Sequence, residues 1–313
     1  MIDRKSTRRL RYAILRGVFR AGIFIAARIP RRAGLALFGA AGSLVYCIPH
    51  EDRNRTLRHL SLIYGNDWDR KRIRSTARGV YRELGKNLFD AFFLTRLPPR
   101  RVDKFVTHDS LDNLREVYDR GKGCIMITAH TGCFEMLLHL FPGYGFKCFA
   151  IGRRMHDEGL DRIVRGMRSG DDIVYMDRSE PPRRIVRLLQ QGRLFGVLVD
   201  QDTAVEGVFA DFLGNAAYTP SGPVKMAMKL NVPLFVVTTA RQPDNRHHIF
   251  VSGPVDLCSG GPDLQHDLVR NVTMVNRIIC DTIRRYPEQW VWMHERWRRS
   301  PSQEDLELLK GIG

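Results

Sequence analysis

The stretch His130-Thr131-Gly132-Cys133-Phe134-Glu135 places a histidine and a glutamate five residues apart. It follows the short apolar run Cys124–Thr128, which is typical of a buried strand. Phe134–Leu138 then indicates the start of a helix. An imidazole at the end of a strand can take a proton from a substrate hydroxyl when a carboxylate holds its other ring nitrogen.

The spacing of the pair limits how the two side chains can meet. On a continuous helix, five residues correspond to about 140° of rotation, which turns the side chains apart. His130 must therefore precede the helix, and Gly132 permits the turn. We expect Glu135 to accept a hydrogen bond from one ring nitrogen and to leave the other free as a general base.

Two alternatives to this interpretation stay open. No serine or lysine nucleophile motif accompanies the pair, which favours direct attack by a substrate group. Cys133 lies three residues from His130, so a Cys–His nucleophile is conceivable, although a small buried hydrophobe is the simpler interpretation. A purely structural histidine–carboxylate pair is the second alternative.

The elements that position these residues alternate between strands and helices. Short apolar runs predict strands, and longer periodic stretches between them predict helices. This alternation is typical of an α/β fold with a mostly parallel central sheet flanked by helices, in which the carboxyl ends of strands carry the chemistry. The strands are expected at 147–151, 173–175, 194–199, 234–239 and 248–251, and the helices at 160–168, 185–191, 222–230 and 264–284.

Further candidate residues follow these runs. Asp200 and Asp202 come after the predicted strand 194–199, so Asp200 is expected at the same sheet edge as His130. Arg154 and Arg168 lie in an arginine-rich segment that could stabilise an oxyanion or bind phosphate. Exposed loop carboxylates and a solvated arginine face are the alternatives.

Composition narrows the class of protein. The 313 residues carry a formal net charge of +16, which favours anionic partners such as lipid surfaces, acidic proteins or nucleic acid. The six cysteines form no C-x-x-C pair and no metal-ligand spacing, so we expect a reducing compartment and no metal site. No glycine-rich phosphate loop and no G-x-S-x-G elbow occurs.

The first 50 residues predict a membrane-associating segment ahead of a catalytic domain at 51–313. Lys5, Arg9, Arg16 and Arg20 share one helical face, and Leu10, Ile14, Val18 and Ile25 share the opposite face. Such a basic amphipathic helix is typical of an anionic membrane interface. The uncharged run 33–49 is either monotopic or a short span. The alternative is a helix that docks on the domain.

Five blocks in order resemble the bacterial lipid A biosynthesis acyltransferases. They are the H-x4-E pair, the arginine block 153–161 followed by Arg168, the segment 199–214 around Asp200-Gln201-Asp202, Thr219–Pro223 and Pro287–His294. The resemblance covers about 53–301. Cys133-Phe134 and Glu158-Gly159 differ from the residues usual in the motifs of this family. The second difference weakens the assignment of a family site role to Arg154.

The resemblance implies a glycerolipid-acyltransferase-like fold and acyl transfer to a hydroxyl of a lipid A precursor at the cytoplasmic face of the inner membrane. The expected donor is an acyl thioester, either of acyl carrier protein or of CoA. His130 is the implied base, Glu135 its orienting partner, and Arg168 and Asp200 the residues of the second and third blocks. No cofactor is expected, because a thioester is already activated.

Three competing functions remain at this stage. The first is a related acyltransferase that uses acyl-CoA on another glycolipid or lysophospholipid, such as a phosphatidylinositol mannoside. The second is a non-enzymatic membrane-binding protein with the same fold. The third is a nucleic-acid binder, which net charge alone would explain but which the ordered blocks do not support.

Overall fold

The computed structural model describes the backbone of residues 4–312 and the side chains of residues 12–98 and 101–312. A seven-stranded sheet lies at its centre, in the order β1-β9-β8-β2-β5-β3-β4. The strands of this sheet are β1 (Val106–His108), β2 (Cys124–Thr128), β3 (Cys148–Gly152), β4 (Ile173–Asp177), β5 (Leu194–Leu198), β8 (Leu234–Arg241) and β9 (His247–Ser252). Only the β8–β9 pair is antiparallel, which confirms the expected α/β fold with a mostly parallel sheet.

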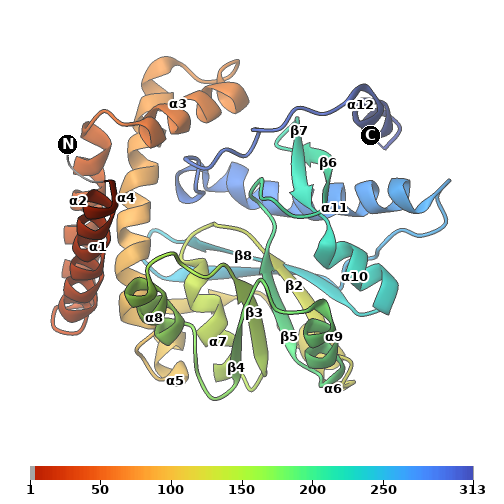
Figure 1. Ribbon diagram of the computed structural model, residues 1–313, viewed down its shortest axis with the longest axis horizontal. Coiled ribbons are helices and arrows are strands. Elements are labelled where there is room, and N and C mark those ends of the chain that lie inside the picture. Colours follow the sequence, from red (N-terminus) through yellow and green to blue (C-terminus); the bar gives the residue numbers. More distant parts are fainter. Residues whose placement is uncertain (1–3, 313) are drawn as a thin grey trace.

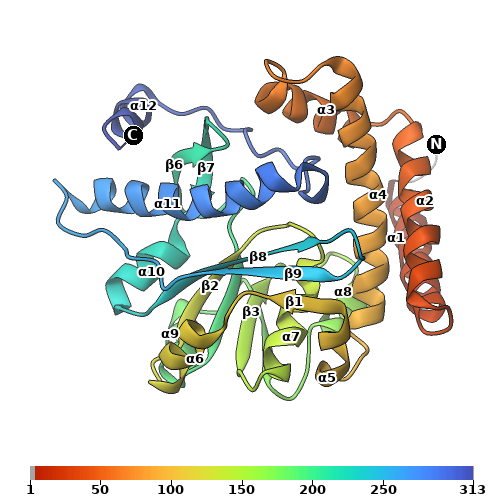
Figure 2. The same ribbon diagram turned by 180° about the vertical axis from the view of Figure 1, so that it is seen from behind.

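Helices cover both faces of the sheet (Figures 1 and 2). On one face α11 packs its apolar stripe against residues such as Ile125 and Val236, and on the other α7 packs against Met126 and Cys148. The helices that follow the first strand are α6 (Asp112–Asp119), α7 (Leu137–Gly143), α8 (Glu158–Met167), α9 (Pro182–Gln190), α10 (Gly222–Leu230), α11 (Leu264–Arg285) and α12 (Gln303–Lys310). Single 3-10 turns are η1 (Asp103–Phe105), η2 (Phe134–Met136) and η3 (Pro287–Gln289).

Two short strands outside the sheet were not expected from the sequence. β6 (Gly207–Phe212) and β7 (Asn215–Pro220) form an antiparallel hairpin that lies against α11 (Figure 1). The turn between them uses Leu213 and Gly214, both with positive φ. The small β1 strand at the sheet edge was also missed, because three residues carry too little pattern to predict a strand.

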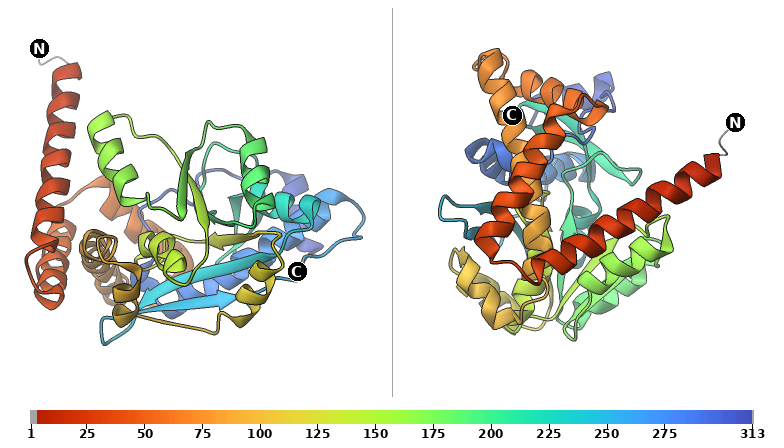
Figure 3. Two further views of the ribbon diagram at one scale, coloured as in Figure 1. Left: turned by 90° about the horizontal axis from the view of Figure 1, so that it is seen from below. Right: turned by 90° about the vertical axis from the view of Figure 1, so that its left-hand side faces the viewer.

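The amino-terminal helices form a separate layer beside the sheet (Figure 1). They are α1 (Arg4–Ala26), α2 (Arg31–Cys47), α3 (Glu51–Tyr64), α4 (Arg70–Leu94) and the short α5 (Pro99–Val102). Aromatic contacts fasten α1 and α2 to α4, with Phe19 against Phe92 and Phe38 against Phe89. The beginning of α1 extends away from the rest of the molecule (Figure 3).

The described side chains of α1 face both the domain and the solvent. Ile14 and Val18 are more than half exposed, whereas Arg16 pairs with Asp157 on the segment before α8. The side chains of Lys5, Arg9 and Leu10 lie outside the described residues. Within residues 4–312, no helix meets the length and hydropathy of a membrane span by itself, and α2 with α3 meets them only as a pair bent by 89°.

Candidate active site

Strand register brings His130 and Asp200 together although 70 residues separate them. β2 and β5 are parallel neighbours, with Thr128 opposite Leu198. His130 and Asp200 each follow their strand by two residues, so they meet at the carboxyl edge of the sheet. His130 Nδ1 lies 2.8 Å from Asp200 Oδ1, and the His130 backbone N–H donates to Asp200 Oδ2, also at 2.8 Å.

Asp200 is a fully buried carboxylate with a complete set of partners. Besides its two bonds from His130, it accepts a hydrogen bond from Trp290 Nε1 at 2.7 Å. Burial opposes its ionisation, but the attraction of His130 and these hydrogen bonds lower its pKa to about 2. Asp200 therefore stays charged at neutral pH and holds the imidazole with a proton on Nδ1.

The other side of the His130 ring is open. Its side chain is 21% exposed, and within residues 4–312 no hydrogen bond reaches Nε2. Phe134 packs edge-on against the ring, with centroids 4.8 Å apart. With Nδ1 committed to Asp200, Nε2 is the nitrogen that can accept a proton from a bound group.

A backbone turn sets this geometry. Gly132 has φ +51°, and a Cβ there would lie 2.6 Å from the Thr239 carbonyl oxygen, so the expected glycine turn is present. Its N–H donates to the Gln289 carbonyl oxygen, and Thr131 forms an isolated bridge with Trp290. The segment after α11 thus fastens the residues that follow His130.

The predicted contact between Glu135 and His130 is wrong in this structure. Glu135 lies in η2 and receives two hydrogen bonds from the Arg168 guanidinium, one of them 2.9 Å from Nε to Oε2. Arg168 also donates to the Tyr175 hydroxyl at 2.7 Å. The reason is that β5 supplies Asp200 directly beside the ring, while the η2 turn directs Glu135 toward Arg168, the residue after α8.

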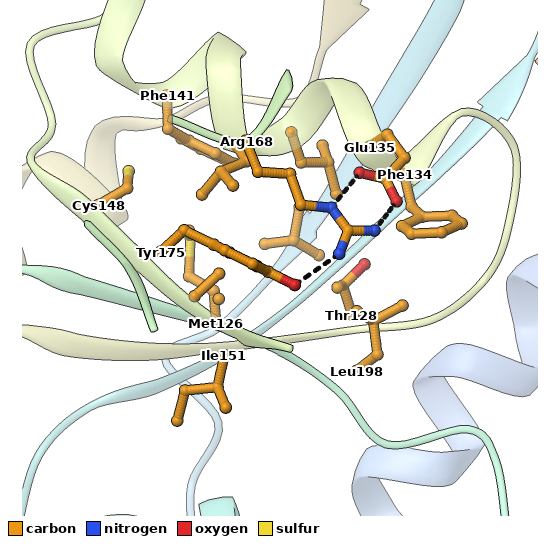
Figure 4. A pocket seen from close by; sticks show the side chains of 15 residues that line it. Met126, Thr128, Phe134, Glu135, Phe141, Cys148, Ile151, Arg168, Tyr175 and Leu198 are labelled. Carbon is orange, nitrogen blue, oxygen red and sulfur yellow. Dashed lines mark hydrogen bonds and ion pairs between the residues drawn. The ribbon is translucent and has the colours of Figure 1, made fainter. Parts of the chain in front are cut away.

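This ion pair lies at one end of a cleft between α7 and the sheet (Figure 4), in which the space open to the centre of a water molecule is about 90 Å³. Although burial opposes the charge on Arg168, the contact with Glu135 raises the pKa of its guanidinium. The remaining lining residues are mainly apolar and come from five strands and the η2–α7 segment: Met126, Thr128, Phe134, Leu137, Leu138, Phe141, Cys148, Ala150, Ile151, Tyr175, Gly196, Leu198 and Val237.

Two other candidates lie away from this chemistry. The Arg154 side chain is 65% exposed and has only a loose ion pair with Glu158, 3.8 Å apart, so it is not part of the cleft. Cys133 is buried, its thiol faces the Asn87 carbonyl oxygen, and burial raises its pKa. A buried thiol with a raised pKa does not supply the thiolate that a nucleophile requires.

Sequence reasoning missed Trp290, Gln289 and Tyr175 as parts of the site. Trp290 and Gln289 stand within the quoted block Pro287–His294, but no spacing rule connects that block to His130. No group of three or more His, Cys, Asp or Glu side chains in the described part of the chain is arranged to hold a metal ion.

A histidine held by a buried carboxylate lies at the sheet edge, and Phe134, which packs against its ring, lines the apolar cleft. The chain belongs to the bacterial lipid A biosynthesis acyltransferase family, whose model matches residues 1–299. It is accordingly an O-acyltransferase.

Named relatives span most of the chain at low identity. A phosphatidylinositol mannoside acyltransferase of Mycolicibacterium smegmatis is 24% identical over 302 residues, which cover 91% of this chain and 92% of that protein. The lipid A biosynthesis palmitoleoyltransferase of Escherichia coli is 26% identical over 230 residues, 72% of each chain. The lipid A biosynthesis lauroyltransferase of the same species is 21% identical over 250 residues, 78% of each chain.

Proposed function

We propose that this protein transfers a fatty acyl group from the thioester of acyl carrier protein to a hydroxyl of a lipid A precursor at the cytoplasmic face of the inner membrane. The observation that carries the proposal is the His130–Asp200 pair, because the His130 ring packs against Phe134 and Phe134 lines the apolar cleft. Family membership supplies the acyltransferase class, and the residues supply the chemistry.

In this mechanism His130 acts as a general base. Nε2 takes the proton of the acceptor hydroxyl while the hydroxyl oxygen attacks the carbonyl carbon of the thioester. Asp200 holds the ring and stabilises the imidazolium that forms. When the tetrahedral intermediate collapses, the C–S bond breaks and the imidazolium returns its proton to the departing thiolate. No covalent enzyme intermediate is formed, and no cofactor takes part.

Arg168 and Glu135 support the reaction from the end of the cleft next to Phe134. A guanidinium has five N–H donors, and Arg168 uses three of them on Glu135 and Tyr175. The other two can meet the developing oxyanion or an anionic part of the donor. Glu135 thus acts in this proposal by positioning Arg168 and not by orienting His130. Arg154 has no assigned role in it.

The apolar cleft holds the acyl chain. Its walls are mainly hydrocarbon, whereas its polar groups cluster where Glu135, Arg168 and Thr128 lie. Such a division suits a substrate with one reactive polar end and a long apolar tail.

A membrane-facing surface fits the same assignment. We define the amino-terminal apolar surface as the large exposed hydrophobic side chains of the first two helices and the residue that follows them: Ile14, Val18, Phe24, Leu37, Leu44, Val45 and Ile48, each between 47% and 68% exposed. Arg20, Arg28 and Arg32 are exposed nearby. Apolar side chains with arginines around them suit insertion into an anionic lipid interface.

A second candidate has a specific observation in its favour. The phosphatidylinositol mannoside acyltransferase matches over 302 residues, more of this chain than the lipid A relatives cover. In that alternative the acceptor is another glycolipid or a lysophospholipid and the donor is acyl-CoA. The proposed base and its partner are the same in both.

The test is product analysis with purified full-length protein. Dodecanoyl thioesters of acyl carrier protein and of CoA are each supplied with a lipid A precursor and, separately, with a phosphatidylinositol mannoside, and the lipids are examined by mass spectrometry. We expect one added acyl ester on the lipid A precursor from the carrier-protein donor. Acylation of the mannoside alone would select the second candidate, and no acylation of either acceptor would contradict both.

A further inference from the structure

We propose that Gly196, together with Ala150 beside it, sets the length of the acyl chain that the cleft accepts. This inference rests on the proposed function, because it treats the cleft as the acyl site. The position of the two residues in the sheet carries it.

Gly196 and Ala150 leave a gap in a row of large side chains. Strand register aligns Phe235, Met126, Gly196, Ala150 and Tyr175 across five neighbouring strands. Residues aligned in this way point to the same face of a sheet. All of this row except Phe235 lines the cleft. The groove under α7 therefore exists where the two smallest members of the row stand.

The space at Gly196 is real and can accept a larger side chain. A Cβ built on Gly196 has one neighbour within 4 Å, the Phe149 carbonyl oxygen at 3.8 Å, which is an ordinary contact. The residue is half-buried although it lies on a central strand of the sheet. Its missing side chain thus opens the cleft, and the fold does not require glycine there.

The position of this row along the strands suits a limit on the length of the bound acyl chain. Gly196 precedes Asp200 by four residues, which places its row roughly 13 Å along the strand from the level of His130. One row deeper lies Cys148, opposite Leu194 on β5, and Figure 4 shows Cys148 and Phe141 away from the Glu135 end. An acyl chain that enters from the Glu135 end must pass Gly196 and Ala150 before it reaches Cys148.

The experiment compares donors of different length in two opposite variants. Saturated acyl thioesters from octanoyl to hexadecanoyl are assayed for kcat/KM with wild-type protein, and the best donor is the reference. Gly196→Val adds three carbon atoms to the cleft. We expect it to lower kcat/KM for the reference donor by roughly 50-fold, at about fourfold per displaced methylene. Donors three or four methylenes shorter should keep their wild-type values. Met126→Ala removes bulk from the same row and should shift the optimum to longer chains.

Controls separate this inference from the proposed function. Gly166→Val changes an exposed glycine of α8 that has no atom within 4 Å of a built Cβ, and should leave the length profile unchanged. Ala150→Leu repeats the test from β3 if Gly196→Val fails to fold. An unchanged profile in a folded Gly196→Val or Ala150→Leu protein would overturn the length assignment and leave acyl transfer intact. Absence of transfer by the wild type with every donor would overturn the proposed function itself.

Discussion

At the scale of single residues, the site depends on a carboxylate that a protein interior normally disfavours. Asp200 has no exposed surface, and it remains ionised because three N–H groups, one of them on the His130 imidazole, compensate for the lost water. This arrangement fixes the tautomer of His130. Removing the charge while keeping the shape should therefore affect both stability and catalysis.

Asp200 makes stability depend on pH in a predictable direction. Its pKa is about 2 in the folded protein and near 4 in an unfolded chain, so its ionised form stabilises the fold above pH 4. That contribution, about 2–3 kcal/mol, should disappear as the pH falls from about 4 to about 2. Urea unfolding of wild type and Asp200→Asn across this range measures it. An equal loss of stability in both proteins would contradict the assignment.

Many residues of the site could be predicted from the sequence, but the carboxylate that pairs with His130 could not. The end of the strand at Thr128 and the acid at Asp200 were both predicted from apolar runs. The choice of partner for His130 was wrong, because Glu135 is near in sequence whereas Asp200 is near only through the β2–β5 register. A run of apolar residues predicts a strand but not its neighbour in the sheet.

At the scale of elements, a buried ionic cluster joins the amino-terminal helices to the sheet. Asp90 on α4 has no exposed surface and accepts hydrogen bonds from Arg31 of α2, Arg241 of β8 and His247 of β9. The Gln289 side chain forms hydrogen bonds with the backbone N–H and carbonyl oxygen of Arg241. The backbone carbonyl oxygen of Gln289 accepts a hydrogen bond from the Gly132 N–H. The cluster thus fixes α2 and α4 relative to the turn that follows His130.

Breaking this cluster should cost far more than breaking a surface pair. Asp90→Asn removes the carboxylate that pairs with Arg31 and leaves Arg241 with Glu83 alone, so we expect a loss of about 3–5 kcal/mol in the free energy of unfolding. Asp244→Asn is the matched control, because the Asp244–Arg246 pair is half exposed and screened by water, so its loss should change the free energy of unfolding far less. Urea titration measures both. Similar values for the two variants would show that the buried cluster is not a structural anchor.

The elements also show where prediction from sequence stops. The helix at Gly222–Leu230 and the start of the helix at Leu264 were predicted at their observed residues, because their apolar positions repeat with helical spacing. The β6–β7 hairpin was missed, since its strands contain small and mixed residues such as Ala210 and Ala217, whose burial depends on α11.

At the scale of the whole molecule, exposed hydrophobic residues concentrate on one layer. The amino-terminal apolar surface lies on α1, α2 and the residue after α2, with few large exposed hydrophobic residues on the other described elements. The basic charge of the chain is also dense here, with ten Lys or Arg residues and one acid among residues 1–32. A membrane interface would cover both features at once.

Vesicle binding tests this surface. Leu44 is 68% exposed on α2, and Leu44→Glu should reduce cosedimentation with anionic phospholipid vesicles by roughly tenfold, because it removes a leucyl side chain that would insert into the lipid and adds charge repulsion. Leu306→Glu on α12 is the control and should bind as the wild type does. Equal binding by all three proteins would mean that another surface meets the membrane.

The most direct test of the central claim is the turnover number of His130→Ala. Loss of a general base lowers the rate by about 10² to 10⁴, so the account predicts a fall in kcat of that size. The variant must retain the wild-type circular dichroism spectrum and melting temperature, and His108→Ala, an exposed histidine at the sheet edge, should keep full activity. Wild-type turnover by folded His130→Ala would contradict the account.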